Sequence, residues 1–319
     1  SNIPTLLVMF PYSIDSQKAM IPIGAPTDYS IENANLFLSK LKKTPYLNLR
    51  PYIASNEVDV TMNFFKTDHH WNFQGAMKAF PYIVDRMLSL KNSTSHGITH
   101  TNINAWQECN LGRKFLGTAG RRTGVLYNGF DENVVYYVPR FDTEIFIEIP
   151  HKGIWRVGPF IKSNIFVENL KKPKSYFFDS GYSIYGKDHP LVRYKNANAP
   201  INQKILIVKD SYAIPIYSFC STIFTEVNVI DLRWFNDMSL TKFIQLQRPD
   251  VLCVMYNPRA LSIVEMFDFG VFDTINKKEL KYIESINMPA TKSQYNHVVV
   301  CDSIRPKMKV YCSIGGLNC

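Results

Sequence analysis

The sequence lacks the features that would place it in a membrane, fibrous or nucleic-acid-binding class. It has no run of about eighteen apolar residues, so it predicts no membrane-spanning helix. It has no internal repeat and no low-complexity segment. It also has no long Lys or Arg block and no nucleic-acid-binding motif, so we expect no nucleic-acid partner. The formal net charge of +9 is then most simply that of a solvated surface, and an anionic partner such as a cell-envelope polymer is the second interpretation.

Cysteine is sparse, and no Cys-x-x-Cys pair occurs, which argues against a structural zinc site. The six cysteines are Cys109, Cys220, Cys253, Cys301, Cys312 and Cys319. Cys220 and Cys253 lie in apolar stretches and are expected to be ordinary buried thiols. The last three lie close together and leave room for one disulfide, but this count does not settle the redox compartment.

The chain does have enough apolar material for a large core. Its 319 residues are 46% hydrophobic and 20% charged, which is the composition of a globular protein. The length suits one large domain or two ordinary ones. The chain begins with Ser1 instead of Met, so we expect that any signal or anchor segment has been removed.

Buried strands alternate with helices in the last third of the chain. Apolar runs at 204–209, 227–231 and 250–257 are separated by 211–224 and 237–247, which are long enough for helices. This βαβαβ pattern predicts a parallel sheet with helices on its faces. Earlier in the chain, a strand is predicted at 5–11 and a helix at 30–43. Residues 110–200 differ, because short alternating or aromatic runs separated by Gly, Asn and Pro predict hairpins and loops. They form either an insertion on one edge of the main domain or a separate small β subdomain.

The motif "TDHHW", residues 67–71, is predicted to lie in a loop directly before a helix. Apolar residues recur at helical spacing from Phe73 to Leu88, and Asn72 is placed to cap that helix. Pro81 lies inside the helix and is expected to kink it.

Ser211 has the placement of a nucleophile. It follows a buried strand and precedes a helix, so its hydroxyl can project over the sheet edge where ligands bind in parallel sheets. Its own N–H can stabilise an oxyanion, and Pro215 suits the first turn of the helix that follows. A serine needs a base and the base needs a carboxylate, and His70 and Asp68 supply both. Arg233 and Asn257 follow the next two strands at the same predicted edge.

Simpler interpretations compete with this one. Serine is a common helix cap, Asp68 could cap the helix after the motif, and Trp71 has the character of a core residue. The His pair with Asp68 could also ligate zinc or iron, although further ligands would have to come from afar. Asp188 and His189 are the other notable donors, in a segment that is either an ordinary loop or a wall of the cleft.

The combination of motifs resembles a known family. "TDHHW" followed by Gly75 and Ala76, then "KILIVKDSYA" and "VNVIDLRWF", is similar to the DHHW proteins of bacteria. These proteins are related to the alginate and peptidoglycan O-acetyltransferases of the SGNH hydrolase superfamily. The segments "SYFFDSGYSIYGKDHPLV" and "DVLCVMYN" also resemble family segments, and the likeness extends from about residue 5 to residue 260.

The resemblance implies roles for particular residues. Ser211 would be the nucleophile, His70 the general base and Asp68 its orienting acid, in the permuted order in which Asp-x-His precedes Ser. The topology adds Arg233 and Asn257 as candidates for the oxyanion site. His69, Trp71 and Tyr212 join them as candidates for substrate binding. Two departures are that the usual Gly-Asp-Ser reads Lys209-Asp210-Ser211, and that the usual Asp-x-x-His is shortened to Asp-x-His.

The expected fold is a single α/β domain over residues 1–319, SGNH hydrolase-like, with a flavodoxin-like three-layer parallel sheet and a hairpin-rich insertion. The expected activity is transfer or hydrolysis of an acyl group, through an acyl-serine, on an O-acetylated cell-envelope or exported polysaccharide. The partners would be an acyl donor, a glycan and a membrane-bound acyl-export protein, outside the cytoplasm, with no metal or other cofactor. A glycan-binding or assembly protein that keeps the fold without catalysis is the alternative.

Overall fold

The computed structural model describes residues 3–13, 24, 27–53, 60–95, 97–124, 132–166, 181–267 and 309–310. The strands are β1 (Thr5–Met9), β2 (Tyr46–Asn48), β3 (Trp106–Lys114), β4 (Asn133–Pro139), β5 (Ile145–Ile149), β6 (Ile154–Gly158), β7 (Leu191–Asn196), β8 (Ile201–Lys209), β9 (Phe224–Ile230), β10 (Val251–Tyr256) and β11 (Lys309–Val310). The α-helices are α1 (Ser30–Lys40), α2 (Arg50–Ile53), α3 (Phe73–Ser89), α4 (Thr118–Thr123), α6 (Phe160–Ser163), α8 (Ile214–Cys220) and α9 (Leu240–Gln247). Cys301, Cys312 and Cys319 lie outside the described residues.

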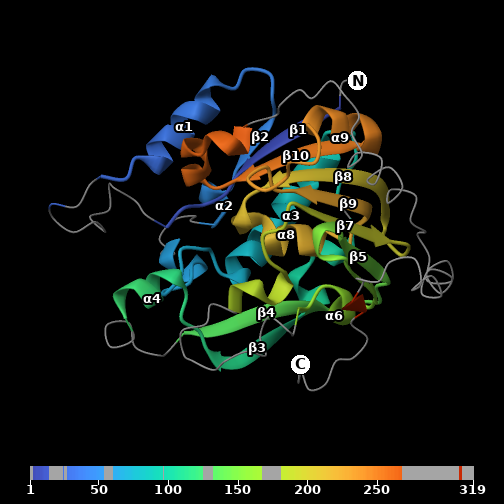
Figure 1. Cartoon of the computed structure of the whole chain (residues 1–319), viewed down its shortest axis with the longest axis horizontal. Helices are drawn as coiled ribbons and strands as arrows, with labels where there is room; N and C mark the ends of the chain where they lie inside the picture. The colour runs from blue at the N-terminus through green and yellow to red at the C-terminus, as the bar shows by residue number, and fades with distance from the viewer. Residues whose placement is uncertain are drawn as a thin grey trace.

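One large mixed sheet organises the chain, in the strand order β11-β6-β5-β7-β9-β8-β10-β1-β2 (Figure 1). The five strands from β9 to β2 run parallel, as the alternating pattern of the last third predicts. Strands β7, β5 and β6 continue the sheet in antiparallel fashion. The expected α/β fold is therefore confirmed.

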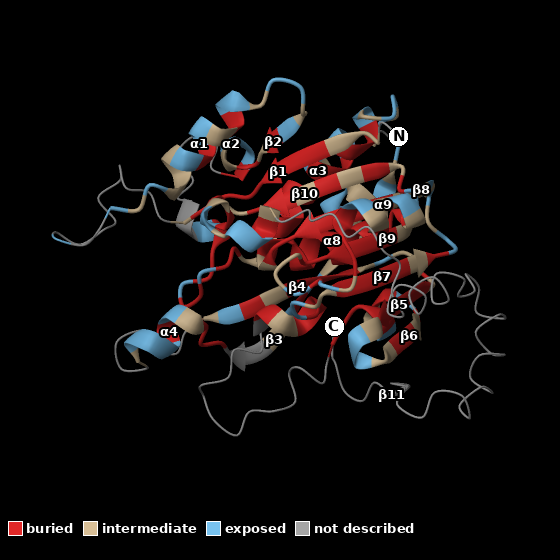
Figure 2. Ribbon diagram, turned by 45° about the horizontal axis from the view of Figure 1, so that its top comes forward, coloured by how far each residue is buried: buried red, intermediate tan, exposed pale blue. Residues whose placement is uncertain are grey.

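Side chains of the parallel strands alternate between two helical layers. On β8, Ile205 and Ile207 pack in the core that includes α3 and α8, whereas Leu206 and Val208 pack with α9. On β1, Leu7 and Met9 pack against α1. This alternation follows from the two-residue period of a strand, and it produces the three-layer arrangement. Figure 2 shows the strands buried along most of their length, while α1 and α9 turn an exposed face outward.

The stretch 110–200 divides between two sheets. Strands β5 to β7 lie on the edge of the main sheet, whereas β3 and β4 form an antiparallel pair of their own. Helix α3 runs from Phe73 through Pro81 to Ser89 as one element, and the Asn72 side chain caps it by accepting a hydrogen bond of 2.8 Å from Gly75 N. The cap confirms its prediction.

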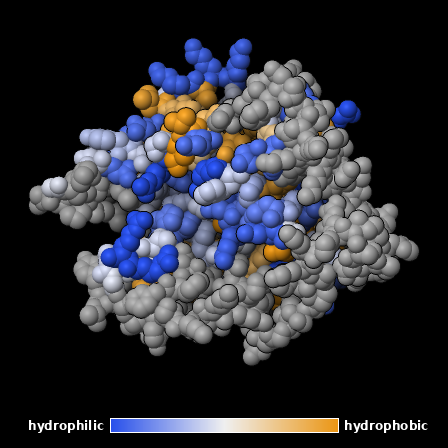
Figure 3. All heavy atoms as spheres, viewed as in Figure 1, coloured by the Kyte–Doolittle hydropathy of each residue, from blue (hydrophilic) through white to orange (hydrophobic). Residues whose placement is uncertain are grey.

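Hydrophilic side chains cover much of the described face in Figure 3, with a smaller hydrophobic area beside α1. Among the helices that the structure describes, none is both long and apolar enough to cross a bilayer.

Candidate active site

Ser211 begins a short 3₁₀ turn, Ser211–Ala213, at the carboxyl end of β8. Asp210 caps this turn, since its carboxylate accepts a hydrogen bond of 2.9 Å from Tyr212 N. Helix α8 follows at once, with Pro215 in its first turn, where a missing N–H does no harm. The half-buried Ser211 is thus held where the strand ends and the helix begins.

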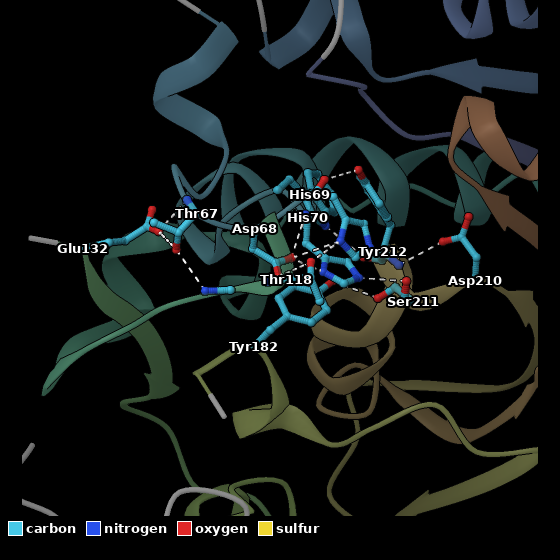
Figure 4. A network of polar contacts seen from close by, with 12 residues as sticks. Thr67, Asp68, His69, His70, Thr118, Glu132, Tyr182, Asp210, Ser211 and Tyr212 are labelled. Atoms are coloured by element: carbon cyan, nitrogen blue, oxygen red, sulfur yellow. Dashed lines mark hydrogen bonds and ion pairs between the residues drawn. The ribbon is translucent and has the colours of Figure 1, made fainter. Parts of the chain in front are cut away.

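The loop before α3 brings its motif to the serine (Figure 4). His70 Nε2 lies 2.8 Å from Ser211 Oγ, and His70 Nδ1 lies 2.5 Å from Asp68 Oδ1. The same carboxylate oxygen accepts the backbone N–H of His70 at 3.0 Å, which fixes the turn between the two residues. The predicted serine, base and acid therefore form one continuous hydrogen-bonded row. This is the order of contacts that an activated serine requires.

Asp68 is held from its far side by the start of α4. Its Oδ2 accepts hydrogen bonds from Thr118 N at 2.8 Å and from Thr118 Oγ1 at 2.9 Å. Burial alone would raise the pKa of Asp68, but its hydrogen bond and charge interaction with His70, together with the Thr118 N–H, lower that pKa well below its usual value. Asp68 is therefore ionised across the neutral range and can stabilise a protonated His70.

Gly117 leaves the space that Asp68 occupies. A Cβ at this position would lie 2.3 Å from Asp68 Cβ and 2.7 Å from Thr67 O, which is closer than atoms can approach. The Gly117 N–H donates to Thr67 Oγ1 at 3.0 Å, and the Thr67 hydroxyl donates to Glu132 Oε2 at 2.6 Å. The backbone before α4 is thus packed directly against side chains of the motif loop.

Tyr182 was not among the residues that the sequence singled out. It lies in a 3₁₀ turn, Gly181–Tyr185, where its ring stacks on His70 with centroids 3.8 Å apart and its hydroxyl donates to Ser211 O at 2.8 Å. The signal available was the family-like segment at 175–192, but no spacing within that segment distinguishes Tyr182 from its neighbouring tyrosines.

Trp71 and Tyr212 are core residues in this structure, which corrects their assignment as substrate contacts. Their exposed fractions are 0% and 1%. Trp71 Nε1 donates to Tyr212 O at 2.8 Å, and Tyr212 Oη donates to His69 O. The two side chains join the motif loop to the serine turn, and neither has surface left for a ligand.

His69 does face outward, with its side chain 50% exposed. Its ring lies 3.8 Å from the ring of His70, and its Nδ1 lies 2.9 Å from Thr118 Oγ1. Partial burial, followed by the charge of His70, lowers the pKa of His69 to about 4, so its imidazole is neutral at neutral pH. Of the candidates for substrate contact, His69 keeps a position at the edge of the site.

The side chains of Asn257 and Arg233, which the topology suggested for an oxyanion site, are hydrogen-bonded to carboxylates. Asn257 Nδ2 donates to Asp210 Oδ2 at 2.7 Å, and its Oδ1 accepts Arg259 N at 2.9 Å. Arg233 Nε donates to Asp231 at 2.9 Å. Both residues lie at the strand ends that the topology predicted, and the carboxylates of Asp210 and Asp231 accept hydrogen bonds from their side chains.

Lys209, in the place of the usual glycine, lies in a cluster of four charges, in which Lys209 and Asp231 are fully buried while Asp188 and Arg233 are partly exposed. Its fully buried Nζ forms ion pairs with Asp231 at 2.8 Å and with Asp188. Arg233 Nη2 also contacts Asp231 at 2.6 Å and Asp188 at 3.2 Å. Two cations and two anions therefore compensate one another beneath the serine turn. Asp188 belongs to this cluster, whereas His189 Nδ1 lies 3.3 Å from His151 Nε2.

Asp68, His69 and His70 also form a cluster of three potential metal ligands, with donor atoms within 4.8 Å of one another. It is the one such group found among the described residues. These are the three residues of the motif that the sequence suggested as ligands, and the group includes no donor from a distant part of the described chain. The facing atoms already have partners, because His70 Nδ1 contacts Asp68 and His69 Nδ1 contacts Thr118.

Comparison with known proteins identifies solved structures that have a similar fold. No family model and no curated protein matches the chain. The solved structure of Bacillus cereus PatB1 is similar with a TM-score of 0.67 and 22% identity, over 84% of this chain and 87% of that one. PatB1 with a sulfonyl adduct is similar with a TM-score of 0.66 and 22% identity, over 84% of this chain and 85% of that one. A DHHW family protein from Eubacterium siraeum is similar with a TM-score of 0.63 and 16% identity, over 86% of this chain and 84% of that one. The resemblance to DHHW proteins that the motifs indicate is thus matched in three dimensions, and the chain has their α/β fold.

Proposed function

We propose that the protein is a serine-dependent acyltransferase or esterase that acts on an O-acetylated polysaccharide. The observation that carries the proposal is the row Asp68–His70–Ser211. His70 lies 2.5 Å from Asp68 and 2.8 Å from Ser211, which is 141 positions away in the sequence. A base within hydrogen-bond reach of a hydroxyl, and a buried carboxylate on the other ring nitrogen, is the arrangement of nucleophilic catalysis.

In the first half of the reaction, Ser211 Oγ attacks the carbonyl carbon of an acyl ester while its proton passes to His70 Nε2. Ionised Asp68 stabilises the imidazolium that forms. The tetrahedral intermediate then collapses, the ester C–O bond breaks, and the departing alkoxide takes the proton back from His70. This leaves the acyl group on Ser211. In the second half, His70 takes a proton from a sugar hydroxyl or from water, and that oxygen attacks the acyl carbon. The bond from that carbon to Ser211 Oγ then breaks, and Ser211 Oγ takes the proton back from His70.

The substrate class and location come from the resemblance to bacterial DHHW proteins. An O-acetylated glycan outside the cytoplasm fits that branch, with an acyl donor supplied by a membrane-bound export partner. The alternative, a glycan-binding protein without catalysis, predicts exposed aromatic side chains gathered on residues 110–200. The exposed large aromatics of the described residues are instead Tyr29, Tyr46, Tyr52, Tyr82 and Trp234, all outside that stretch.

The test uses an aryl acetate ester for turnover and an aryl sulfonyl fluoride for labelling, with intact mass as the readout. We expect wild-type protein to hydrolyse the ester and to gain one sulfonyl group. Ser211→Ala and His70→Ala should each lose at least about a hundredfold in turnover, as removal of a nucleophile or base does. Ser89→Ala, at an exposed serine of α3, is the matched control and should behave as wild type. Full turnover by Ser211→Ala would overturn the proposal.

If turnover and labelling depend on Ser211, the acceptor is tested next. Incubation with an acetyl donor and an oligosaccharide distinguishes transfer from hydrolysis. Transfer gives a mass gain of roughly 42 Da on the sugar for each acetyl group, because acetyl replaces hydrogen when the sugar hydroxyl displaces Ser211 from the acyl-serine. Binding of the oligosaccharide without any acyl chemistry would favour the alternative.

A further inference from the structure

Tyr182 contacts both the base and the nucleophile of the proposed site. Its ring lies against His70 at a centroid distance of 3.8 Å and an interplanar angle of 14°, while its hydroxyl donates to Ser211 O at 2.8 Å. In Figure 4 its ring lies beside the imidazole, with the hydroxyl directed to the serine turn. One side chain therefore touches two catalytic candidates that come from different loops.

The surroundings of Tyr182 keep it in place. Phe73, the first residue of α3, stacks on it at 5.6 Å, and Phe65 meets it edge-on at 6.2 Å. The residue is only 4% exposed. Burial raises the pKa of Tyr182 well above its ordinary value, so its phenol stays protonated and remains a donor. A caged ring with a fixed donor can hold its partners with little loss of freedom.

The stack also has an electrostatic consequence. The face of an aromatic ring is electron-rich and attracts a cation placed over it. During the proposed acyl transfer His70 becomes an imidazolium while Ser211 reacts. Tyr182 presents its face to that ring, so the charged form gains an attraction that the neutral form has to a much smaller degree.

We infer that Tyr182 is a positioning residue that orients the His70 ring, favours its protonated form through the stacked face, and fixes the serine turn through its hydroxyl. This inference rests on the proposed function, because both partners are its catalytic candidates. The ring and the hydroxyl of Tyr182 have different roles, and separate substitutions can test each of them.

Other groups around His70 set the background for any pH effect. Asp68 and His69 face it from the motif loop, and Tyr212 faces it from the serine turn with ring centroids 5.3 Å apart. Asp188 is close enough that the charge of His70 contributes to lowering the pKa of that carboxyl, after Lys209 and Arg233. All of these groups are retained when Tyr182 is replaced.

The experiment compares Tyr182→Phe, Tyr182→Leu and Tyr185→Phe in aryl acetate hydrolysis across pH 4 to 9. Tyr185 is the matched control, because it is buried in the same turn and its hydroxyl donates to Tyr137 O at 2.7 Å, without contact to His70 or Ser211. Tyr182→Phe keeps the ring and removes the donor. Tyr182→Leu removes both.

We expect Tyr182→Phe to lower kcat roughly three- to tenfold with KM unchanged, the effect of losing one hydrogen bond that orders the nucleophile. Tyr185→Phe should stay within about twofold of wild type in kcat, since the hydrogen bonds that its hydroxyl makes with Tyr137 N and Tyr137 O are remote from the reaction. In Tyr182→Leu, the acid limb of kcat/KM should move to lower pH, because the imidazolium loses its aromatic partner. In Tyr182→Phe that limb should stay in place.

Equal kcat values for Tyr182→Phe and Tyr185→Phe would overturn the role of the hydroxyl. An acid limb that is the same in Tyr182→Leu and wild type would overturn the role of the ring. If Tyr182→Leu does not fold, Tyr182→Trp, which keeps an aromatic face without the phenol, should leave the limb in place, and a shift in it would count against the inference. Labelling of Ser211 in wild type separates the cases: without it the proposed function fails, and with it only the role of Tyr182 is in question.

Discussion

Asp210 ties the serine turn to the end of β10 through Asn257. One oxygen of the Asp210 carboxylate accepts Asn257 N at 2.6 Å and Asn257 Nδ2 at 2.7 Å, while the other accepts Tyr212 N at 2.9 Å. Neighbouring parallel strands are thereby joined just beyond their last residues. Ser211 lies at this junction, so its position depends on Asp210, although the Asp210 carboxylate does not contact the Ser211 side chain.

Replacement of Asp210 by Asn should therefore weaken both fold and reaction. The amide group of the introduced Asn directs two hydrogens toward N–H donors that need an acceptor. This should lower the free energy of unfolding by about 1–3 kcal/mol. Burial, only partly offset by hydrogen bonds from Asn257 and Tyr212, raises the pKa of Asp210 to about 6. A raised acid pKa means that the folded state binds protons more tightly, so this group opposes folding increasingly as pH rises from about 4 to 6.

Urea titrations at several pH values test this. The gap in unfolding free energy between wild type and Asp210→Asn should narrow as pH rises through that window. A gap that widens over the same range would contradict the raised pKa.

Gly117→Ala should abolish most activity while leaving the core intact. The added methyl group would overlap Asp68 and Thr67 O, so the carboxylate has to move away from His70. A loss of roughly a hundredfold or more in turnover is expected when the orienting acid is displaced. Ala119→Ser, which adds an atom at an exposed position two residues on, is the control. Wild-type turnover in Gly117→Ala would show that the loop relaxes without disturbing Asp68.

Asp68 should make the fold sensitive to acid. Its pKa is lowered in the folded state, so the stability it contributes is present above the pKa of the unfolded chain, about 4, and is lost as pH falls below that value. In Asp68→Asn this component should be missing. Thermal denaturation from pH 7 to pH 3 should therefore show a smaller drop in Tm for the variant. An equal drop in both proteins would place the acid sensitivity elsewhere.

Lys209→Met should destabilise far more than Lys204→Met on the same strand. Lys209 is fully buried and pairs with Asp188 and Asp231, and its removal leaves the buried Asp231 carboxylate with one cation fewer, which should cost about 3–5 kcal/mol of unfolding free energy. Lys204 pairs with Glu226 at 3.3 Å near the surface, and its loss should cost about 0–1 kcal/mol. Chemical denaturation measures both. Similar values would mean that the buried cluster is no stronger than a surface pair.

The sequence predicted the parallel strands of the last third and the pairing of its two motifs, because strand periodicity and motif order are local or family-wide signals. It did not reveal Tyr182 or Gly117, whose importance lies in contacts with residues more than 25 positions away. It also did not indicate the carboxylate partners of Asn257 and Arg233. Placing a residue at a strand end locates its backbone, but the direction of its side chain depends on which acid lies nearby, here Asp210 and Asp231.

Two hydrogen bonds join the motif loop to the serine turn, from Trp71 Nε1 to Tyr212 O and from Tyr212 Oη to His69 O, and they have a consequence for how the chain acquires activity. They join residues 141 and 143 positions apart, so they form only after a long loop has closed and most of the sheet between them has assembled. A refolding chain would gain helices and local hairpins well before it gained a competent serine. The return of turnover would then mark the last docking event of folding, so a measurement of activity would report that folding is complete.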